Sequence, residues 1–202
     1  PQDGYTIVNE PNPVGSYRKE FILPVEWKER EVFIHFDGCY SGLYVFVNGK
    51  KVGYSQGASN DAEFNITKYV KPGRNILACE VYRWTDGSYL EDQDFFRYSG
   101  VGRDCYLYAR DKKRIQDIRV TPDLDSQYKD GTLNIAIDMK GSGTVALDLT
   151  DAQGKSVATA DLKGSGKLDT TINVANPAKW TAETPNLYTL TATLKNGSTI
   201  TE

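Results

Sequence analysis

Apolar and polar residues alternate with a period of two along most of the chain, the pattern of strands with one buried face. In the run EVFIHFDG, Val32, Ile34 and Phe36 fall on one face. Phe33 and His35 fall on the other face, and an Asp-Gly turn ends the run. No stretch keeps a helical period over three turns. The pattern predicts an all-β protein.

Two turns punctuate the first half of the chain. In LYVFVNGKKVGYSQG, two β-rich runs flank Asn48-Gly49, and Asn-Gly favours a type I′ hairpin because both central residues need positive φ. Pro72-Gly73 predicts a second turn, between AEFNITKYV and the apolar run NILACEVYRW.

A change of composition after the charged run RDKKRI predicts a domain boundary, with domains at residues 1–111 and 112–202. The second domain is smaller, poor in aromatic residues, and carries strand patterns roughly every ten residues. We interpret GSGT (141–144), DAQGKSV and KNGST as its hairpin turns. This spacing is typical of an immunoglobulin-like sandwich.

Charge and cysteine usage exclude several classes of function. The net charge of −3 provides no basic field for nucleic acid or an anionic membrane. No apolar run approaches the ~18 residues of a membrane span. Cys39, Cys79 and Cys105 are too few and too far apart for a disulfide framework, and we expect them at buried strand positions. This usage is compatible with the cytoplasm or the periplasm and does not decide between them.

His35 is the only histidine, so a catalytic triad would have to be built on it. Its position inside a strand favours a structural role. One histidine and three scattered cysteines also cannot form a usual zinc site.

The stretch YLEDQDFFR, residues 89–97, combines acids and aromatic rings more densely than any other part of the chain. Its acids could belong to a solvated loop, capping turns or pairing with Arg83, Arg97 and Arg103. Carboxylates close together could instead bind a hard cation or supply the acid and base of glycoside hydrolysis. Rings beside acids also suit a sugar, which stacks its C–H face and offers hydroxyls. The residues alone leave these alternatives open.

Five segments follow one another along the chain: NPVGSYRKEF, FIHFDG, LYVFVNGKKVGYSQG, RWTDGSYLEDQD and ANPAKWTAETPNLYTL. In this order they resemble the front end of β-galactosidases of glycoside hydrolase family 2. The acidic-aromatic segment separates them from the related β-glucuronidases, which share the VNGK hairpin. The resemblance implies a jelly-roll, galactose-binding-like β-sandwich and then an immunoglobulin-like one. A TIM barrel with two catalytic Glu residues follows in the family, and no catalytic residue is expected in these 202 residues.

The resemblance assigns roles to two residues. Asn12 matches the family's asparagine that hydrogen-bonds the galactosyl unit, and Asp94 matches its aspartate that contacts galactose and helps to hold sodium. Glu91 and Asp92 are expected to orient the loop and pair with arginine. The resemblance also allows for magnesium in the catalytic domain. We expect the Asp94 loop to face solvent.

Two positions depart from the family pattern. Phe96 stands where tryptophan is usual, and Gly102 stands where a bulky residue is common. Both are expected in the loop that faces the barrel, where they would affect substrate preference.

Two hypotheses follow. The chain starts without an initiator Met and ends on a strand pattern that should continue, so we expect the non-catalytic N-terminal part of a β-galactosidase. Its partner would be a β-galactoside bound with the barrel, and a homo-oligomer is compatible with the family. The alternative is a free-standing carbohydrate-binding or adhesion module.

Overall fold

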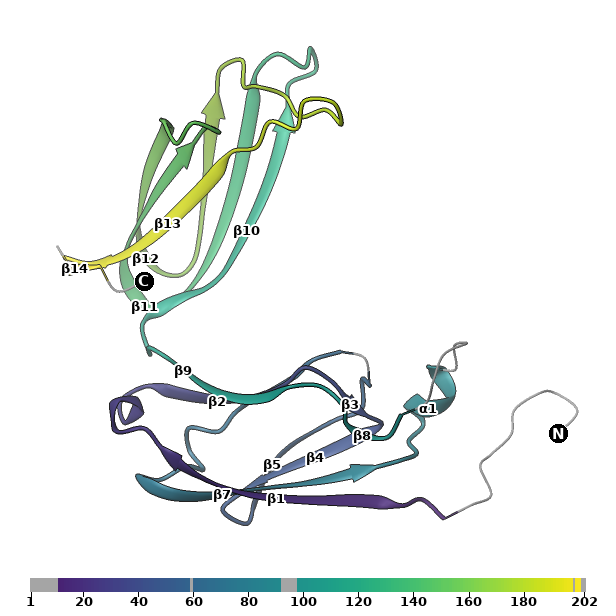
Figure 1. Ribbon diagram of the computed structural model, residues 1–202. Coiled ribbons are helices and arrows are strands. Elements are labelled where there is room, and N and C mark those ends of the chain that lie inside the picture. The colour runs from purple at the N-terminus through teal and green to yellow at the C-terminus, as the bar shows by residue number, and fades with distance from the viewer. Residues whose placement is uncertain (1–10, 59, 92–97, 198, 201–202) are drawn as a thin grey trace, which may run out of the picture. The chain divides into compact units, whose positions relative to one another are not determined.

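The computed structural model describes residues 11–58, 60–91, 98–197 and 199–200 (Figure 1). The chain divides into two compact units, Pro1–Asp111 (unit 1) and Lys112–Glu202 (unit 2). Each unit has a hydrophobic core of its own. Helical structure in the described residues is limited to one 3-10 turn and one four-residue helix.

Unit 1 is a sandwich of two main sheets, seen as two layers in Figure 1. One sheet has the order β1-β7-β4-β5 and the other β6-β2-β9, while β3 and β8 form a small third sheet. The elements are β1 (Val14–Leu23), η1 (Val25–Trp27), β2 (Glu31–Phe36), β3 (Cys39–Tyr40), β4 (Gly42–Val47), β5 (Lys50–Ser55), β6 (Ala62–Asn65), β7 (Gly73–Tyr82), α1 (Gly87–Leu90), β8 (Gly100–Val101) and β9 (Cys105–Arg110).

The alternation along β2 produces the core of unit 1, as the sequence predicts. Val32, Ile34 and Phe36 are buried between the two main sheets, together with apolar residues of β4 and β7. The hairpin at Asn48-Gly49 is also confirmed, because these residues join β4 to β5 with φ of 50° and 78°. Such positive values are those that a type I′ turn requires.

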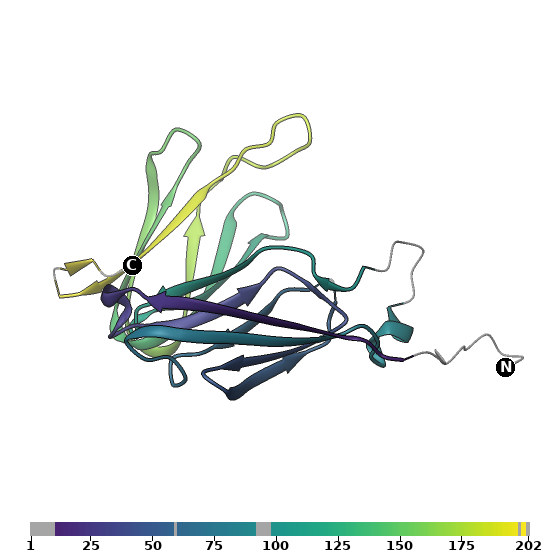
Figure 2. The ribbon, with the colours of Figure 1, turned by 60° about the horizontal axis from the view of Figure 1, so that its bottom comes forward.

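Unit 2 is built on two long, curved antiparallel strands (Figure 2). Its strands are β10 (Arg114–Leu124), β11 (Gly131–Thr150), β12 (Ser156–Val174), β13 (Thr189–Asn196) and β14 (Thr199–Ile200). The first half of β11 pairs with β10 and the second half pairs with β13, while β12 follows β11 along both halves. Ile135, Ile137, Val145 and Leu147 alternate inward from the two halves and form one core.

The expected hairpin turn at 141–144 is wrong, because GSGT lies inside β11. The ladder with β12 shifts register between Met139 and Ser142, and Gly141 has a φ of +81°. A bulge of this kind bends a strand without ending it. Four predicted strands therefore merge into β11 and β12. The hairpin turns expected at DAQGKSV and KNGST are confirmed, joining β11 to β12 and β13 to β14.

The cysteine expectation holds for two of three residues. Cys39 and Cys79 are buried, and desolvation raises the pKa of their thiols to about 11 and about 12. Cys105 is exposed, so the expectation that it is buried is wrong. It is the first residue of β9, where the strand enters the sheet edge and its side chain is left uncovered.

Candidate functional site

The Asn12 side chain ties together the ends of two strands of unit 1. Its Nδ2 donates to the Trp84 carbonyl at 2.9 Å, and its Oδ1 accepts from the Trp84 N–H at 2.9 Å. The Arg83 N–H donates to the Pro13 carbonyl at 3.1 Å, which extends the β1–β7 ladder by one step. An amide side chain has two N–H groups and two acceptor lone pairs, so half of the capacity of Asn12 is left for other partners.

The segment after Trp84 is fixed by a network of hydroxyls. The buried Ser41 Oγ lies 2.6 Å from Thr85 Oγ1 and 2.9 Å from Ser88 Oγ. Ser88 Oγ also accepts from the Thr85 N–H at 3.0 Å, while Asp86 caps α1 by accepting from the Gly87 N–H at 3.0 Å. Short polar side chains at a helix start satisfy its free N–H groups in this way. The chain therefore enters the acidic run from a fixed position.

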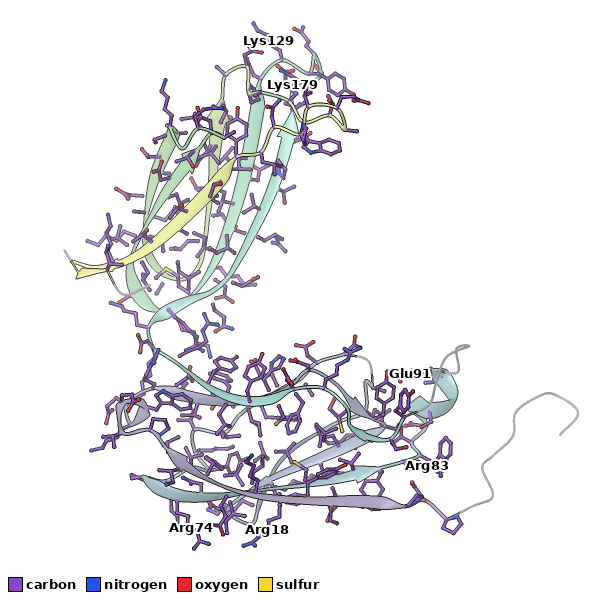
Figure 3. The ribbon with its side chains drawn as sticks, in the orientation of Figure 1. Arg18, Arg74, Arg83, Glu91, Lys129 and Lys179 are labelled. Atoms are coloured by element: carbon purple, nitrogen blue, oxygen red, sulfur yellow. The ribbon has the colours of Figure 1, made fainter. Side chains whose placement is uncertain are left out.

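Asp94 lies outside the described residues, and so do Asp92, Phe96 and Arg97. Glu91 is half-buried at the end of α1, with its N–H donating to the Gly87 carbonyl at 2.9 Å. Figure 3 shows Glu91 and Arg83 at the same end of unit 1. Pairing of Glu91 and Asp92 with arginine stays a prediction.

The two arginines of this region have other contacts. The Arg83 guanidinium lies 4.8 Å from the Trp84 ring centroid. Arg103 donates from Nη1 to the Asp37 carbonyl at 3.2 Å. Gly102 is exposed, and a Cβ built on it would have no atom within 4 Å. A Cβ at this position would therefore meet open space.

His35 contacts two carboxylates and a tyrosine ring. Its Nε2 lies 3.1 Å from Asp37 Oδ1, and its Nδ1 lies 3.3 Å from Glu63 Oε2. The ring stacks on Tyr106 with centroids 4.9 Å apart, and the side chain is 14% exposed. Both ring nitrogens thus face carboxylates. Among the described residues, no Ser, Thr or Cys side chain that could act as a nucleophile forms a hydrogen bond with the imidazole.

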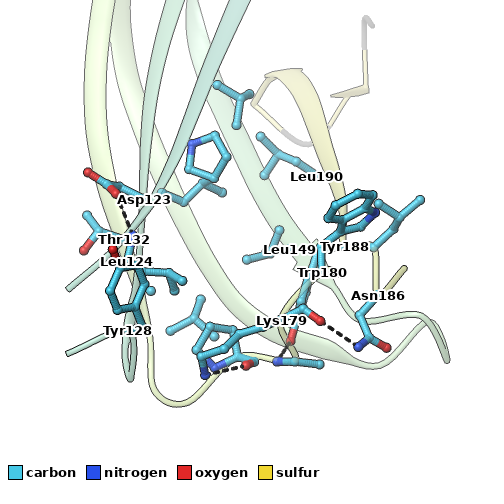
Figure 4. Close-up of a pocket in the computed structure, with 18 residues that line it drawn as sticks. Asp123, Leu124, Tyr128, Thr132, Leu149, Lys179, Trp180, Asn186, Tyr188 and Leu190 are labelled. Atoms are coloured by element: carbon cyan, nitrogen blue, oxygen red, sulfur yellow. Dashed lines mark hydrogen bonds between the residues drawn. The ribbon is translucent and has the colours of Figure 1, made fainter. Parts of the chain in front are cut away.

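Unit 2 contains an apolar pocket of about 600 Å³ that sequence reasoning missed (Figure 4). Trp180, which is 62% exposed, and Leu187 come to it from the irregular segment before β13. That segment is held by Asn186 Nδ2, which donates to the Lys179 carbonyl at 2.9 Å, as Figure 4 shows. The signal in the sequence was NPAKWTAETPNLY, a Pro-, Trp- and Tyr-bearing stretch in which strand alternation stops.

The described residues provide no evident metal centre. Within those ranges, no group of three or more His, Cys, Asp or Glu side chains is arranged to hold an ion. Nor does any helix in the same ranges have the length and apolar character needed to cross a membrane.

Both units match family models. Residues 4–111 match the sugar binding domain of glycosyl hydrolases family 2, and residues 113–202 match a second domain model of the same family. The chain belongs to glycosyl hydrolases family 2. The expected fold class, a jelly-roll sandwich followed by an immunoglobulin-like sandwich, is thereby confirmed.

Among curated relatives, the chain is 42% identical to a β-galactosidase of Priestia megaterium over 200 residues and 45% identical to one of Aeromonas hydrophila over 197 residues. These matches cover 93% and 91% of this chain, but 19% of each relative. The chain thus spans about a fifth of their length. It corresponds to N-terminal domains of β-galactosidase-like enzymes, and the 202 residues contain no catalytic barrel.

Solved structures show the same fold. A β-glucuronidase of Bacteroides uniformis superposes with a TM-score of 0.75 at 25% identity, covering 95% of this chain and 26% of that one. A β-glucuronidase of Ruminococcus gnavus gives 0.74 at 22% identity, covering 98% and 37%.

Proposed function

We propose that these two units serve a β-galactosidase by completing its sugar site, while the catalytic carboxylates stand on a barrel outside this sequence. The observation that carries the proposal is the double hydrogen bond between Asn12 and Trp84. It joins the start of β1 to the segment that leads into the acidic run. Asn12 is thereby fixed beside the segment that leads to Asp94 in the sequence, and in this proposal the two residues act on the same sugar.

The division of labour follows from chemistry. Retaining glycosidases need two carboxyl groups about 5–5.5 Å apart, one as acid/base and one as nucleophile. Asn12 offers an amide, with one N–H and one lone pair beyond its Trp84 bonds, which suits a sugar hydroxyl. Such contacts bind and orient the galactosyl unit, and orientation alone can lower a barrier by several kcal/mol. Asp94 is in this proposal a positioning and binding residue.

Sodium belongs to the same proposal. It is a hard cation that takes oxygen ligands, and the carboxylate of Asp94 is a donor of that kind. In this proposal the ligands besides Asp94 come from another domain. When bound, the ion supplies charge that fixes the carboxylate against the sugar. Magnesium, where it occurs, is assigned to the catalytic domain.

The proposal is tested by measuring β-galactoside hydrolysis by the 202-residue chain and by the protein that its full reading frame encodes. The chain alone is expected to hydrolyse a chromogenic β-galactoside no faster than buffer. In the full-length protein, Asp94→Asn should raise KM or lower kcat/KM by at least about a hundredfold, or roughly 2.7 kcal/mol. Asp104→Asn, an exposed acid of the same unit, is the matched control and should leave both constants unchanged.

Two outcomes would overturn the proposal. One is turnover by the pure 202-residue chain, since the chemistry would then reside in these units. The other is a stop codon within a few residues of Glu202. That finding would favour the alternative, a free-standing carbohydrate-binding or adhesion module without enzyme activity. The alternative also predicts micromolar galactose binding by the chain alone.

A further inference from the structure

Three tyrosines gather on the outer face of the β1-β7-β4-β5 sheet. Tyr44 pairs with Tyr54 across the β4–β5 ladder, and its neighbours Leu43 and Val45 point into the core. Because side chains alternate along a strand, Tyr44 must point outward. Its ring centroid lies 4.5 Å from that of Tyr54, tilted by 38°, and 5.7 Å from that of Tyr82, nearly edge-on.

The rings border a hollow of about 340 Å³, at the small end of the range for small-molecule sites, roughly 300–1,000 Å³. Lys51 Nζ lies 4.2 Å from the centroid of Tyr44, so an ammonium group stands at the hollow. Glu80 lies directly opposite Tyr44 on β7 and lines the same space. No hydrogen bond or ion pair is recorded for the Glu80 carboxylate within the described ranges.

Backbone and side-chain contacts hold the hollow in shape. The Tyr54 hydroxyl donates to Gln56 Oε1 at 2.6 Å, which fixes the orientation of the ring. A Cβ on Gly42 would lie 2.7 Å from Thr85 Cγ2 and 3.3 Å from the Tyr54 hydroxyl. Glycine at this position therefore lets Tyr54 lie close against the strand, with 40% of the residue exposed to solvent. A ring that is fixed before binding loses little entropy when a ligand stacks on it.

We propose that this hollow binds a neutral pyranose unit of an oligosaccharide. A pyranose presents an apolar C–H face, which packs on the exposed Tyr54 ring, and a rim of hydroxyls. Glu80 accepts from those hydroxyls, Lys51 donates to them, and the Tyr44 and Tyr82 hydroxyls can do either. The charges of Glu80 and Lys51 have opposite sign, so the ligand itself does not need a charge. Neither Asn12 nor Asp94 is among the described residues that line this hollow, although Trp84, which bonds to Asn12, is.

Titration of the 202-residue chain with lactose, cellobiose and maltose, followed by amide chemical shifts, tests this proposal. At least one sugar should shift amides of residues 43–56 and 79–85 with a millimolar dissociation constant. Tyr54→Ala should weaken that binding about tenfold or more, which corresponds to ~1.4 kcal/mol. Tyr54→Phe keeps the ring and should retain most of the binding.

Matched controls separate the site from general effects. Tyr106, exposed on the other sheet, should tolerate Tyr106→Ala without change in binding. Asp94→Asn should also leave this binding intact, although the proposed galactosidase role predicts a loss of activity in the full-length enzyme. The two proposals can therefore fail independently.

Absence of shifts with all three sugars would overturn the proposed pyranose site, as would unchanged binding in Tyr54→Ala. Concentration-dependent self-association that Tyr54→Ala abolishes would also overturn it, since the tyrosine face would then bind a second copy of the chain.

Discussion

The two units hold their connections between strands in opposite ways. In unit 1, the buried Asn75 (0% exposed) accepts from Asn48 Nδ2 at 2.8 Å and from the Lys71 N–H at 2.9 Å. Its own Nδ2 donates to the carbonyls of Lys71 and Gly73. In unit 2, the exposed Asp125 closes the β10–β11 turn by accepting from the N–H groups of three residues that follow it: Gln127, Lys129 and Asp130.

The difference follows from topology. In unit 1, β6 belongs to one main sheet and β7, which contains Asn75 near its start, to the other, so the connection between them crosses the edge of the core. Backbone groups buried there need a polar partner, and an internal side chain supplies it. In unit 2, Asp125 lies between strands that pair with each other, where water reaches the turn. The loops that we propose to serve the sugar thus lie in the unit that holds a connection with a buried side chain, whereas unit 2 holds this turn with an exposed one.

Asn75→Ala should give the largest effect. It leaves the polar partners of Asn75 without their hydrogen bonds in a buried site, and should lower the free energy of unfolding of unit 1 by about 3 kcal/mol. Denaturant unfolding measures the loss, and hydrogen exchange assigns it to unit 1. Asn173→Ala, at an exposed position of unit 2, is the control and should cost under about 0.5 kcal/mol. Equal losses would remove the proposed contrast between the units.

Asp125→Ala should have a smaller, pH-dependent effect. Hydrogen bonds from the Lys129 and Asp130 amides lower the pKa of Asp125 below its usual value. A carboxylate with a depressed pKa stabilises the fold above its unfolded pKa of about 3.9 and loses this contribution as the pH falls through its folded pKa. The variant should melt below the wild type at pH 7, and the difference should vanish in acid. An unchanged gap in melting temperature at pH 2 and pH 7 would contradict this. Asp161→Ala, another exposed acid of unit 2, is the control.

Gly102→Phe should give the smallest effect. The position is exposed, its Cβ would meet nothing, and its backbone conformation is open to any residue, so the change should stay within about 0.5 kcal/mol. Gly53→Ala is the matched contrast, because its Cβ would overlap the Phe64 ring in unit 1. Thermal unfolding of the two variants compares an open glycine with a packed one. Similar melting temperatures would show that the Phe64 ring can move aside.

The sequence predicts the class of fold because period-two alternation depends on burial alone. The β2 face and the Asn48-Gly49 hairpin follow from local rules. The merging of four predicted strands into β11 and β12 does not follow from such local rules. A glycine such as Gly141 suits both a turn and a bulge, and only the pairing of β11 with the distant β10 and β13 decides between these two structures. The exposure of Cys105 likewise depends on which residues cover a sheet edge.

The candidate site could be predicted less completely. The family likeness points to Asn12, but not to its two hydrogen bonds with Trp84, which join residues 72 positions apart. The Tyr44 hollow and the Trp180 pocket were both missed. Each is made by residues from several strands or loops, and no short motif encodes such a meeting.

The bulge at Gly141 has a consequence for how unit 2 folds. Because β11 does not turn back there, one hairpin around residues 151–155 brings together nearly all of β11 and β12 through contacts that grow outward from a five-residue loop. Contacts local in sequence cost little loop-closure entropy and form fast. This hairpin is therefore expected to be structured in the transition state, with β10 and β13 added afterwards. Unit 1, whose β1 must find β7 some fifty residues later, should fold more slowly.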